Sequence, residues 1–128
     1  MKEIKIDDVS KPIYMEVKKS TIENTGKGVF VLKDFEKDEL IEKAPYLLDD
    51  REITKKTVFK DYYFNYKGQA AMAFGYIGMI NHSFQSNASY MVKEDAIYLR
   101  AKKKINKNEE IFINYGTSYW RASKISPV

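Results

Sequence analysis

Three short motifs carry the side chains of this chain that are best suited to chemistry. In chain order they are Gly26-Lys27-Gly28, Asn81-His82-Ser83 and Asn114-Tyr115-Gly116. A glycine pair lets the backbone approach an anionic ligand group and present N–H donors to a carboxylate. The other two motifs supply an amide, an imidazole and a phenol, which can hold and orient a polar ligand through hydrogen bonds.

Each motif also has an ordinary structural interpretation. The glycine pair can be a turn that needs positive φ, and Val31 shows that it is no dinucleotide-binding fingerprint. His82 alone can be a core histidine, Asn81 a turn former and Tyr115 the end of a strand. Trp120 can be the large aromatic anchor of a small core. Both interpretations stay open when each motif is taken singly.

Short strands are the elements that must position these motifs. Alternating or β-rich runs bounded by turn signals predict strands, and they cover 14–18, 28–32, 40–48, 62–66, 90–92, 97–99 and 111–113. Pro45 predicts a bend or an edge strand within the third of these runs. Weak helical spacing marks 51–61, and 75–80 is either one helical turn or a buried loop. The pattern therefore predicts a mostly β fold with fragments of helix.

Composition bounds the class of protein. A chain of 128 residues has the length of one domain, and we expect a lead-in over 1–12, the domain over 13–120 and a tail over 121–128. The chain has no cysteine and one histidine, so disulfides and thiolate metal sites are excluded and no metal is expected. The opening residues lack the apolar core of a signal peptide, which predicts a soluble intracellular protein.

The charge is mildly basic, with a formal net charge of +4. Its densest basic run is Lys102, Lys103 and Lys104, close to Arg100. This run can be a solvated strand end or a contact with a polyanion, and a small nucleic-acid binder is one hypothesis for the chain.

The order of the motifs points further than any one of them. A glycine pair, then Asn-His-Ser, then Glu-Glu-Ile leading to Tyr-Gly resembles the SET-domain family of protein-lysine methyltransferases. The stretches 61–64 and 71–75 resemble those that precede Asn-His-Ser in that family, so the likeness runs from about 14 to 120. It resembles most the compact SET proteins, a viral one among them, that lack flanking cysteine clusters. Phe84 and Ser86 stand where the family often has Cys and Pro.

The resemblance implies a fold and a cofactor. The family's fold has several short curved sheets and a knot-like C-terminal core, in which the segment ending at the tyrosine passes beneath the Asn-His loop. It binds S-adenosylmethionine on one face and the target lysine on the other, joined by a narrow channel. By that likeness the cofactor-binding residues are Lys27, Gly28, Tyr62, Asn81, His82 and Trp120. The first two would offer backbone groups to the methionine end, the amide and imidazole would hold the amino and adenine parts, and the indole would stack on the adenine.

By the same likeness, Tyr115 is the catalytic residue and lines the lysine channel with Tyr76 and Ile113. Methyl transfer is an in-line displacement by a neutral amine, so geometry does most of the work. A lysine begins with a pKa of about 10.4, and an aromatic channel favours loss of its proton. Because Ile113 carries no hydroxyl to hold water, we expect a product beyond monomethyl-lysine.

Several alternatives stay open at this point. The enzyme hypothesis competes with a non-catalytic SET-fold binding module or scaffold. The substrate would be a histone tail, which implies the nucleus and chromatin, or another basic protein, which implies the cytoplasm. The acidic pairs at 49–50, 94–95 and 109–110 can attract a basic tail or be solvated turns. A homodimer could complete the site, and neither a membrane nor nucleic acid is required.

Overall fold

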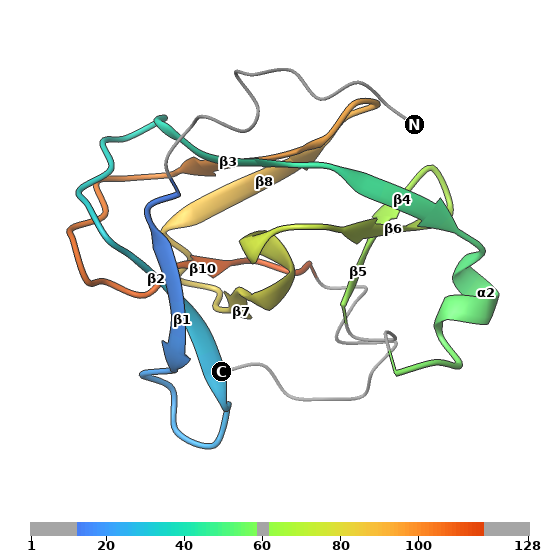
Figure 1. The fold of residues 1–128 in the computed structure, drawn as a ribbon, viewed down its shortest axis with the longest axis horizontal. Coiled ribbons are helices and arrows are strands. Elements are labelled where there is room, and N and C mark those ends of the chain that lie inside the picture. Colours follow the sequence, from blue (N-terminus) through green and yellow to red (C-terminus); the bar gives the residue numbers. More distant parts are fainter. Residues whose placement is uncertain (1–12, 59–61, 117–128) are drawn as a thin grey trace.

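The structure, a computed structural model, describes residues 13–58 and 62–116. Short strands in small sheets dominate it, with little helix (Figure 1). The strands are β1 (Met15–Lys19), β2 (Lys27–Val31), β3 (Leu40–Ala44), β4 (Tyr46–Asp49), β5 (Tyr63–Tyr66), β6 (Gln69–Ala73), β7 (Asn81–His82), β8 (Ala88–Val92), β9 (Ile97–Ala101) and β10 (Phe112–Ile113). Two helical pieces accompany them, α2 (Arg51–Thr54) and the 3-10 turn η1 (Tyr76–Met79). The mostly β architecture predicted from the sequence is confirmed.

The hairpin β1–β2 brings the glycine pair into the fold. The turn between the strands closes with a hydrogen bond from the Ser20 N–H to the Gly26 carbonyl at 2.8 Å. Asn24 and Gly26 adopt φ of 63° and 86°, a region that asparagine and glycine tolerate best. From Gly28 onward β2 is buried, so it passes through the core and not over the surface.

Pro45 divides the predicted strand over 40–48 into two strands in different sheets. β3 pairs with β9 in the sheet β3-β9-β8, and β4 pairs with β6 in the sheet β4-β6-β5. Proline has no N–H to give to a ladder and restricts the residue before it, so a strand changes direction there. Its carbonyl still accepts the Phe74 N–H at 2.8 Å.

One core joins these sheets. Its largest fully buried side chains share an aliphatic, mostly branched character and are Val29, Val31, Ile77, Ile80, Ile97, Leu99, Ile105, Ile111 and Ile113. Burial of each contributes about 1.5–3 kcal/mol against unfolding before the cost of chain entropy. Ile80 precedes the Asn-His motif, and Ile113 precedes the Tyr-Gly motif, so fully buried core residues anchor both motifs.

The shortest strands, β7 and β10, form a parallel pair near the centre of the molecule (Figure 1). Phe112 lies opposite Asn81, and Ile113 lies opposite His82. Parallel neighbours need a long connection, and here the hairpin β8–β9 supplies it. Two motifs far apart in the sequence therefore lie side by side.

Most of the predicted elements are confirmed, with differences in detail. The weak helical spacing over 51–61 corresponds to α2, which covers only Arg51–Thr54, and 75–80 contains the turn η1. The sequence interpretation assigned no strand to 69–73, where β6 lies at the centre of its sheet. The expected lead-in over 1–12 and tail over 121–128 lie outside the described residues. Within the described part of the chain, no helix is both long and apolar enough to cross a membrane.

Candidate functional site

Tyr115 is tied to the Asn-His strand at both ends of the residue. Its backbone N–H donates to Nδ1 of His82 at 2.9 Å, and its phenol hydroxyl donates to the Ile80 carbonyl. The phenol and imidazole rings lie 5.2 Å apart between centroids. The structure thus brings the predicted catalytic tyrosine against the strand that bears Asn81 and His82.

His82 is held as a neutral imidazole. It is 4% exposed, and burial lowers the pKa of its side chain because a charged ring loses its hydration there. Since Nδ1 accepts the Tyr115 N–H, the ring proton belongs on Nε2. The Phe84 ring packs edge-on against the imidazole with centroids 4.6 Å apart. His82 is therefore suited to orient neighbours and not to carry charge.

Asn81 connects this strand to the glycine motif. Its side-chain Nδ2 donates to the Lys27 carbonyl at 3.0 Å and to Oε2 of Glu110 at 3.1 Å. These bonds use both amide hydrogens. None of the described residues donates to its Oδ1, so this oxygen is the acceptor that Asn81 offers to a ligand.

Glu110 is the buried carboxylate of the site, with 4% exposure. Besides Asn81, it accepts the Ser20 hydroxyl at 2.8 Å, the Thr21 N–H at 2.8 Å and the Thr21 hydroxyl at 2.6 Å. Hydrogen bonds to a charged acceptor are short and strong, and a buried carboxylate needs such donors to offset the loss of water. Glu110 therefore links the β1–β2 turn to the Asn-His strand.

The two glycines of the first motif are required for different reasons. Gly26 has φ of 86° with open space around it, so the turn interpretation is confirmed there. A Cβ on Gly28 would stand 2.1 Å from Oε2 of Glu110 and 3.0 Å from Nδ2 of Asn81. The close approach at Gly28 is made by a protein carboxylate, whereas the functional interpretation of the glycine pair expected an anionic ligand group there.

Glu42 positions the turn that carries Tyr76. Its carboxylate accepts the backbone N–H groups of Tyr76 and Ile77, each at 2.9 Å. Burial raises the pKa of the Glu42 carboxyl, and these two bonds partly oppose the rise. A Cβ on Gly75 would lie 2.8 Å from the carboxylate. Tyr76 itself is partly buried and packs on the core.

The remaining predicted site residues lie in different settings. Ile113 is wholly buried in the core, opposite His82. Tyr62 precedes β5 and is 51% exposed. Trp120 lies outside the described residues. The structure thus brings together the Asn81, His82 and Tyr115 group, with the glycine motif beside it.

Three polar residues hold this arrangement, namely Glu110, Glu42 and Asn87. Sequence reasoning assigned no role to Glu42 or Asn87, and it considered Glu110 only as part of an acidic pair for a basic tail or a solvated turn, which is wrong because Glu110 is buried. The Asn87 amide donates to the Glu110 carbonyl at 2.9 Å, and its Oδ1 accepts the Phe112 N–H at 2.8 Å. Asn87 thereby fastens β10 to the loop before β8. Glu110 belongs to the Glu-Glu-Ile run and Asn87 follows Asn81-His82-Ser83 by four residues, but nothing in the sequence shows which groups they bond.

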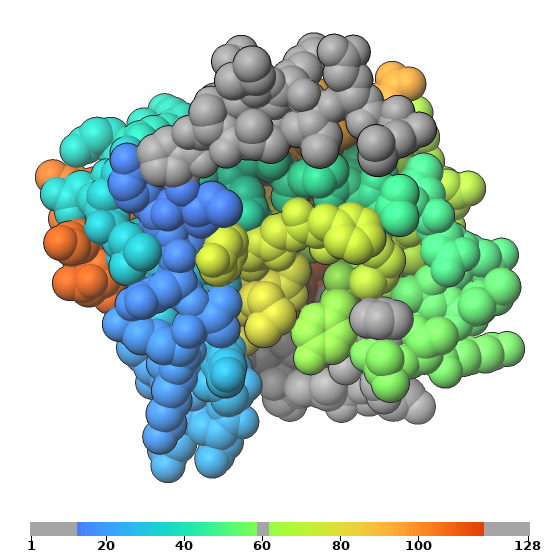
Figure 2. Space-filling view, viewed as in Figure 1, coloured from blue at the N-terminus to red at the C-terminus, as the bar shows by residue number. Residues whose placement is uncertain are grey.

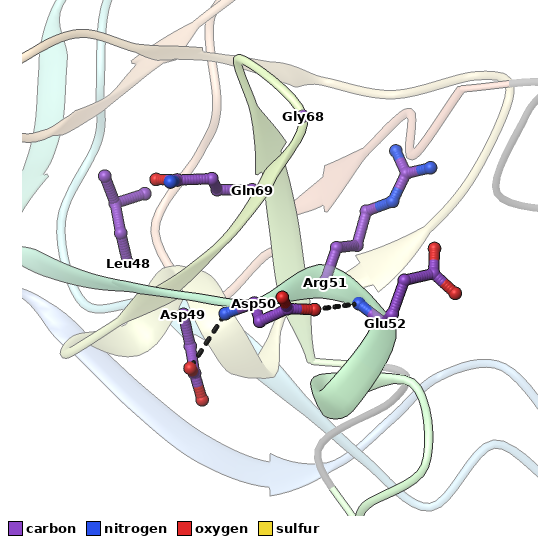
Figure 3. Close-up of a pocket in the computed structure, with 7 residues that line it drawn as sticks. All are labelled: Leu48, Asp49, Asp50, Arg51, Glu52, Gly68 and Gln69. Carbon is purple, nitrogen blue, oxygen red and sulfur yellow. Dashed lines mark hydrogen bonds between the residues drawn. The ribbon is translucent and has the colours of Figure 1, made fainter.

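A separate hollow of about 470 Å³ lies by β4 and α2 (Figure 3). It is lined by Leu48, Asp49, Asp50, Arg51, Glu52, Gly68 and Gln69, and none of these is a predicted site residue. Oδ1 of Asp49 accepts the Asp50 N–H, and Oδ1 of Asp50 accepts the Glu52 N–H, both at 2.8 Å. These carboxylates act as a turn and a helix N-cap, so the hollow is a polar surface feature apart from the candidate site.

Comparison with known proteins agrees with this geometry. The family model of the SET domain matches residues 26–116, which contain all three motifs. SET domain-containing protein 8 of Schizosaccharomyces pombe is 49% identical over 41 residues, covering 32% of this chain and 10% of that protein. The chain therefore matches only about a tenth of the length of this curated relative.

Solved structures share the fold. A crystal structure of a candidate histone methyltransferase from Plasmodium falciparum has a TM-score of 0.70 at 29% identity, covering 86% of this chain and 99% of the other. Polycomb repressive complex 2 of Chaetomium thermophilum bound to S-adenosylmethionine has a TM-score of 0.70 at 22% identity, covering 83% of this chain and 15% of the other. The second likeness shows the fold alone. With the family model matched over the motifs and the same fold in these structures, the chain belongs to the SET-domain family.

Proposed function

We propose that this chain is an S-adenosylmethionine-dependent protein-lysine N-methyltransferase. The observation that carries the proposal is the convergence of Tyr115, His82 and Asn81, from segments remote in sequence, in a chain of the SET-domain family. Likeness to a candidate histone methyltransferase over nearly the whole of both chains supports it.

The residues present fit the cofactor. The Asn81 amide oxygen can accept from an ammonium, because both amide hydrogens are already donated. Next to Asn81, Gly28 and exposed Lys27 would offer backbone groups to the methionine end of the cofactor. His82 is neutral and so does not repel a cationic sulfonium. We propose that Tyr62 lines the cofactor pocket and that the indole of Trp120 stacks on the adenine.

When bound, the cofactor supplies an electrophilic methyl group on sulfur. The chain's part is to hold the acceptor amine in line and uncharged. Tyr115 is fixed by its bonds to His82 and Ile80, so its phenol oxygen can accept an amine N–H in a defined direction. Aromatic and apolar walls from Tyr76, Ile113 and Tyr115 disfavour the ammonium form of the substrate lysine.

The residue before Asn114 sets the expected degree of methylation. Ile113 is wholly buried and has no hydroxyl, so it cannot anchor a water next to the amine. We propose that the pocket admits a partly methylated lysine and yields a product beyond monomethyl-lysine. Mass spectrometry of peptide products at long reaction times tests this, and a single added methyl at completion would contradict it.

The proposed substrate is a histone tail or another basic protein. One similar solved structure is that of the Chaetomium complex with H3K27me3 and H3K27M. A histone substrate implies the nucleus and chromatin, and another basic protein implies the cytoplasm. A second copy of the chain could complete the site, which solution scattering at working concentration would reveal as a dimer.

The test is transfer of radiolabelled methyl from S-adenosylmethionine to core histones and to a cell extract, followed by mapping of the modified residue. We expect label on lysine with the wild-type chain and a much smaller amount with Tyr115→Phe. Label of equal amount in both would remove Tyr115 from catalysis. Cofactor binding without transfer to any protein would favour the non-catalytic module instead.

A further inference from the structure

Glu110 divides its two carboxylate oxygens between different tasks. Oε1 accepts the Thr21 N–H at 2.8 Å and the Thr21 hydroxyl at 2.6 Å. Oε2 accepts the Asn81 amide at 3.1 Å and the Ser20 hydroxyl at 2.8 Å, and this hydroxyl also lies 3.1 Å from Oε1. One oxygen is thus bound to a backbone donor that cannot turn, and the other faces the side chain that we assign to ligand binding.

The surroundings of the Asn81 amide allow one orientation. Its two hydrogens point at the Lys27 carbonyl and at the Glu110 carboxylate, neither of which can donate. A half-turn of the amide would set Oδ1 against two acceptors and leave two hydrogens unmatched. The amide therefore presents an oxygen and not an NH₂ group, which selects a ligand that donates hydrogen bonds.

We propose that Glu110 is the positioning residue that makes Asn81 a receptor for the cofactor's ammonium group. The inference rests on the proposed function, because it names a ligand group for that same site. Gly28 is also required for this arrangement, because a Cβ there would occupy the place of Oε2 of Glu110. Glu110 touches no ligand and acts only through Asn81.

Glu110→Gln tests the inference with little change of shape. The fixed Thr21 N–H needs an acceptor, so the glutamine oxygen takes the place of Oε1 and its NH₂ takes the place of Oε2. The Ser20 oxygen, which already accepts the Ile22 N–H at 3.0 Å, can accept the glutamine NH₂ as well while its own hydrogen turns to the glutamine oxygen. The Asn81 NH₂ then faces the glutamine NH₂, and neither group can accept a hydrogen bond. Glutamine thus frees the Asn81 amide selectively. Glu110→Asp is the second variant, because its shorter carboxylate cannot reach both Thr21 and Asn81.

The probes are S-adenosylhomocysteine and its deaminated analogue, which keeps the carboxylate and the adenosine but lacks the amine. Calorimetry of the wild-type chain should show tighter binding of the aminated probe. Glu110→Gln should weaken that probe about tenfold, as expected for one lost charge-assisted hydrogen bond, and the deaminated probe less than about twofold. In Asn81→Ala, adding Glu110→Gln should weaken binding no further.

Glu109→Gln is the matched control, because the neighbouring Glu109 carboxylate is exposed and only caps the Asn106 turn. It should leave both affinities unchanged. Equal losses for the two probes in Glu110→Gln would mean a merely structural role, and no loss for either would also overturn the inference.

A measurement without ligand separates this inference from the proposed function. In the wild type the Asn81 side-chain amide should give two well-dispersed hydrogen signals by NMR, and in Glu110→Gln these should converge toward solvent-exposed values. If the wild type shows two dispersed Asn81 amide signals but binds neither probe, the cofactor assignment is wrong, although Glu110 still orients the Asn81 amide. If the Asn81 amide signals of the wild type already have the values of a solvent-exposed amide, Glu110 does not orient Asn81 and the inference is wrong.

Discussion

The candidate site and the β4–α2–β5–β6 region are held together in contrasting ways. Around the site, buried side chains such as Glu110 and Asn87 bond backbone groups of remote segments. Around α2, local ladders and an exposed cap carry the structure, and Leu47 and Ile53 stand 61% and 60% exposed. Figure 2 shows the α2 region, in green, at one end of the molecule.

This contrast predicts which substitutions should change stability and activity most. A buried polar group that loses its partner costs its desolvation in full, whereas an exposed one finds water. We therefore expect changes near the site to alter stability and function strongly, and matched changes near α2 or in exposed turns to alter them little.

Tyr115→Phe should reduce methyl-transfer kcat/KM at least about a hundredfold, about 3 kcal/mol of the barrier. The phenol oxygen is lost from the reacting centre while the ring remains. Loss of its bond to the Ile80 carbonyl should cost about 1–2 kcal/mol of folding stability, which leaves the chain folded. Tyr98→Phe, whose hydroxyl donates to Asp95 on an exposed face, should retain activity within about twofold.

Asn87→Ala should lower the free energy of unfolding by about 3 kcal/mol. It leaves the Glu110 carbonyl and the Phe112 N–H without their partners inside the protein. Urea unfolding followed by circular dichroism measures the change. The matched Asn106→Ala removes an exposed amide bond to Glu109 and should change stability by under about 0.5 kcal/mol; similar losses in both would erase the contrast.

Asp50→Ala should cost about 1 kcal/mol, since it removes the N-cap of α2. The cap bonds only the Glu52 and Ile53 N–H groups, and water can replace it. Methyl transfer should stay at the wild-type rate. A large loss of activity in this variant would show that the α2 region serves the site, contrary to the division drawn above.

Glu42 should give the wild-type chain a small dependence of stability on pH. Burial raises the pKa of this carboxyl in the folded state, so the folded state holds a proton that the unfolded state has released. Stability then falls as pH rises from the ordinary glutamate range through the raised folded pKa. Denaturant titrations at several pH values measure the dependence of the free energy of unfolding on pH, and Glu42→Gln should remove it. If the dependence is unchanged in this variant, another group causes it.

Sequence alone reached much of the fold because its signals are local. Turn-forming residues and β-rich runs predicted most of the strands, and Pro45 predicted a bend or an edge strand where β3 ends and β4 begins. β6 was missed because its alanine-rich run has no strand period, and its burial comes from lying between β4 and β5. For this strand, tertiary context outweighed local preference.

The sequence predicted only part of the site, because contacts between remote segments have no local signal. The resemblance to the SET-domain family, which the order of the motifs carries, predicted that Asn81, His82 and Tyr115 converge. The sequence could not show that Glu110 fills the space at Gly28, because a side chain's partner 82 positions away has no local signature. The same holds for Glu42, whose partners at 76 and 77 lie on another element.

The most direct test of the central claim uses the chain's single histidine, whose ring signals in NMR need no assignment against others. Titration with S-adenosylmethionine should shift the His82 ring signals saturably in the wild type, and weakly or not at all in Asn81→Ala. Ring signals that stay in place at millimolar cofactor would contradict a methyl-donor site built on Asn81, His82 and Tyr115.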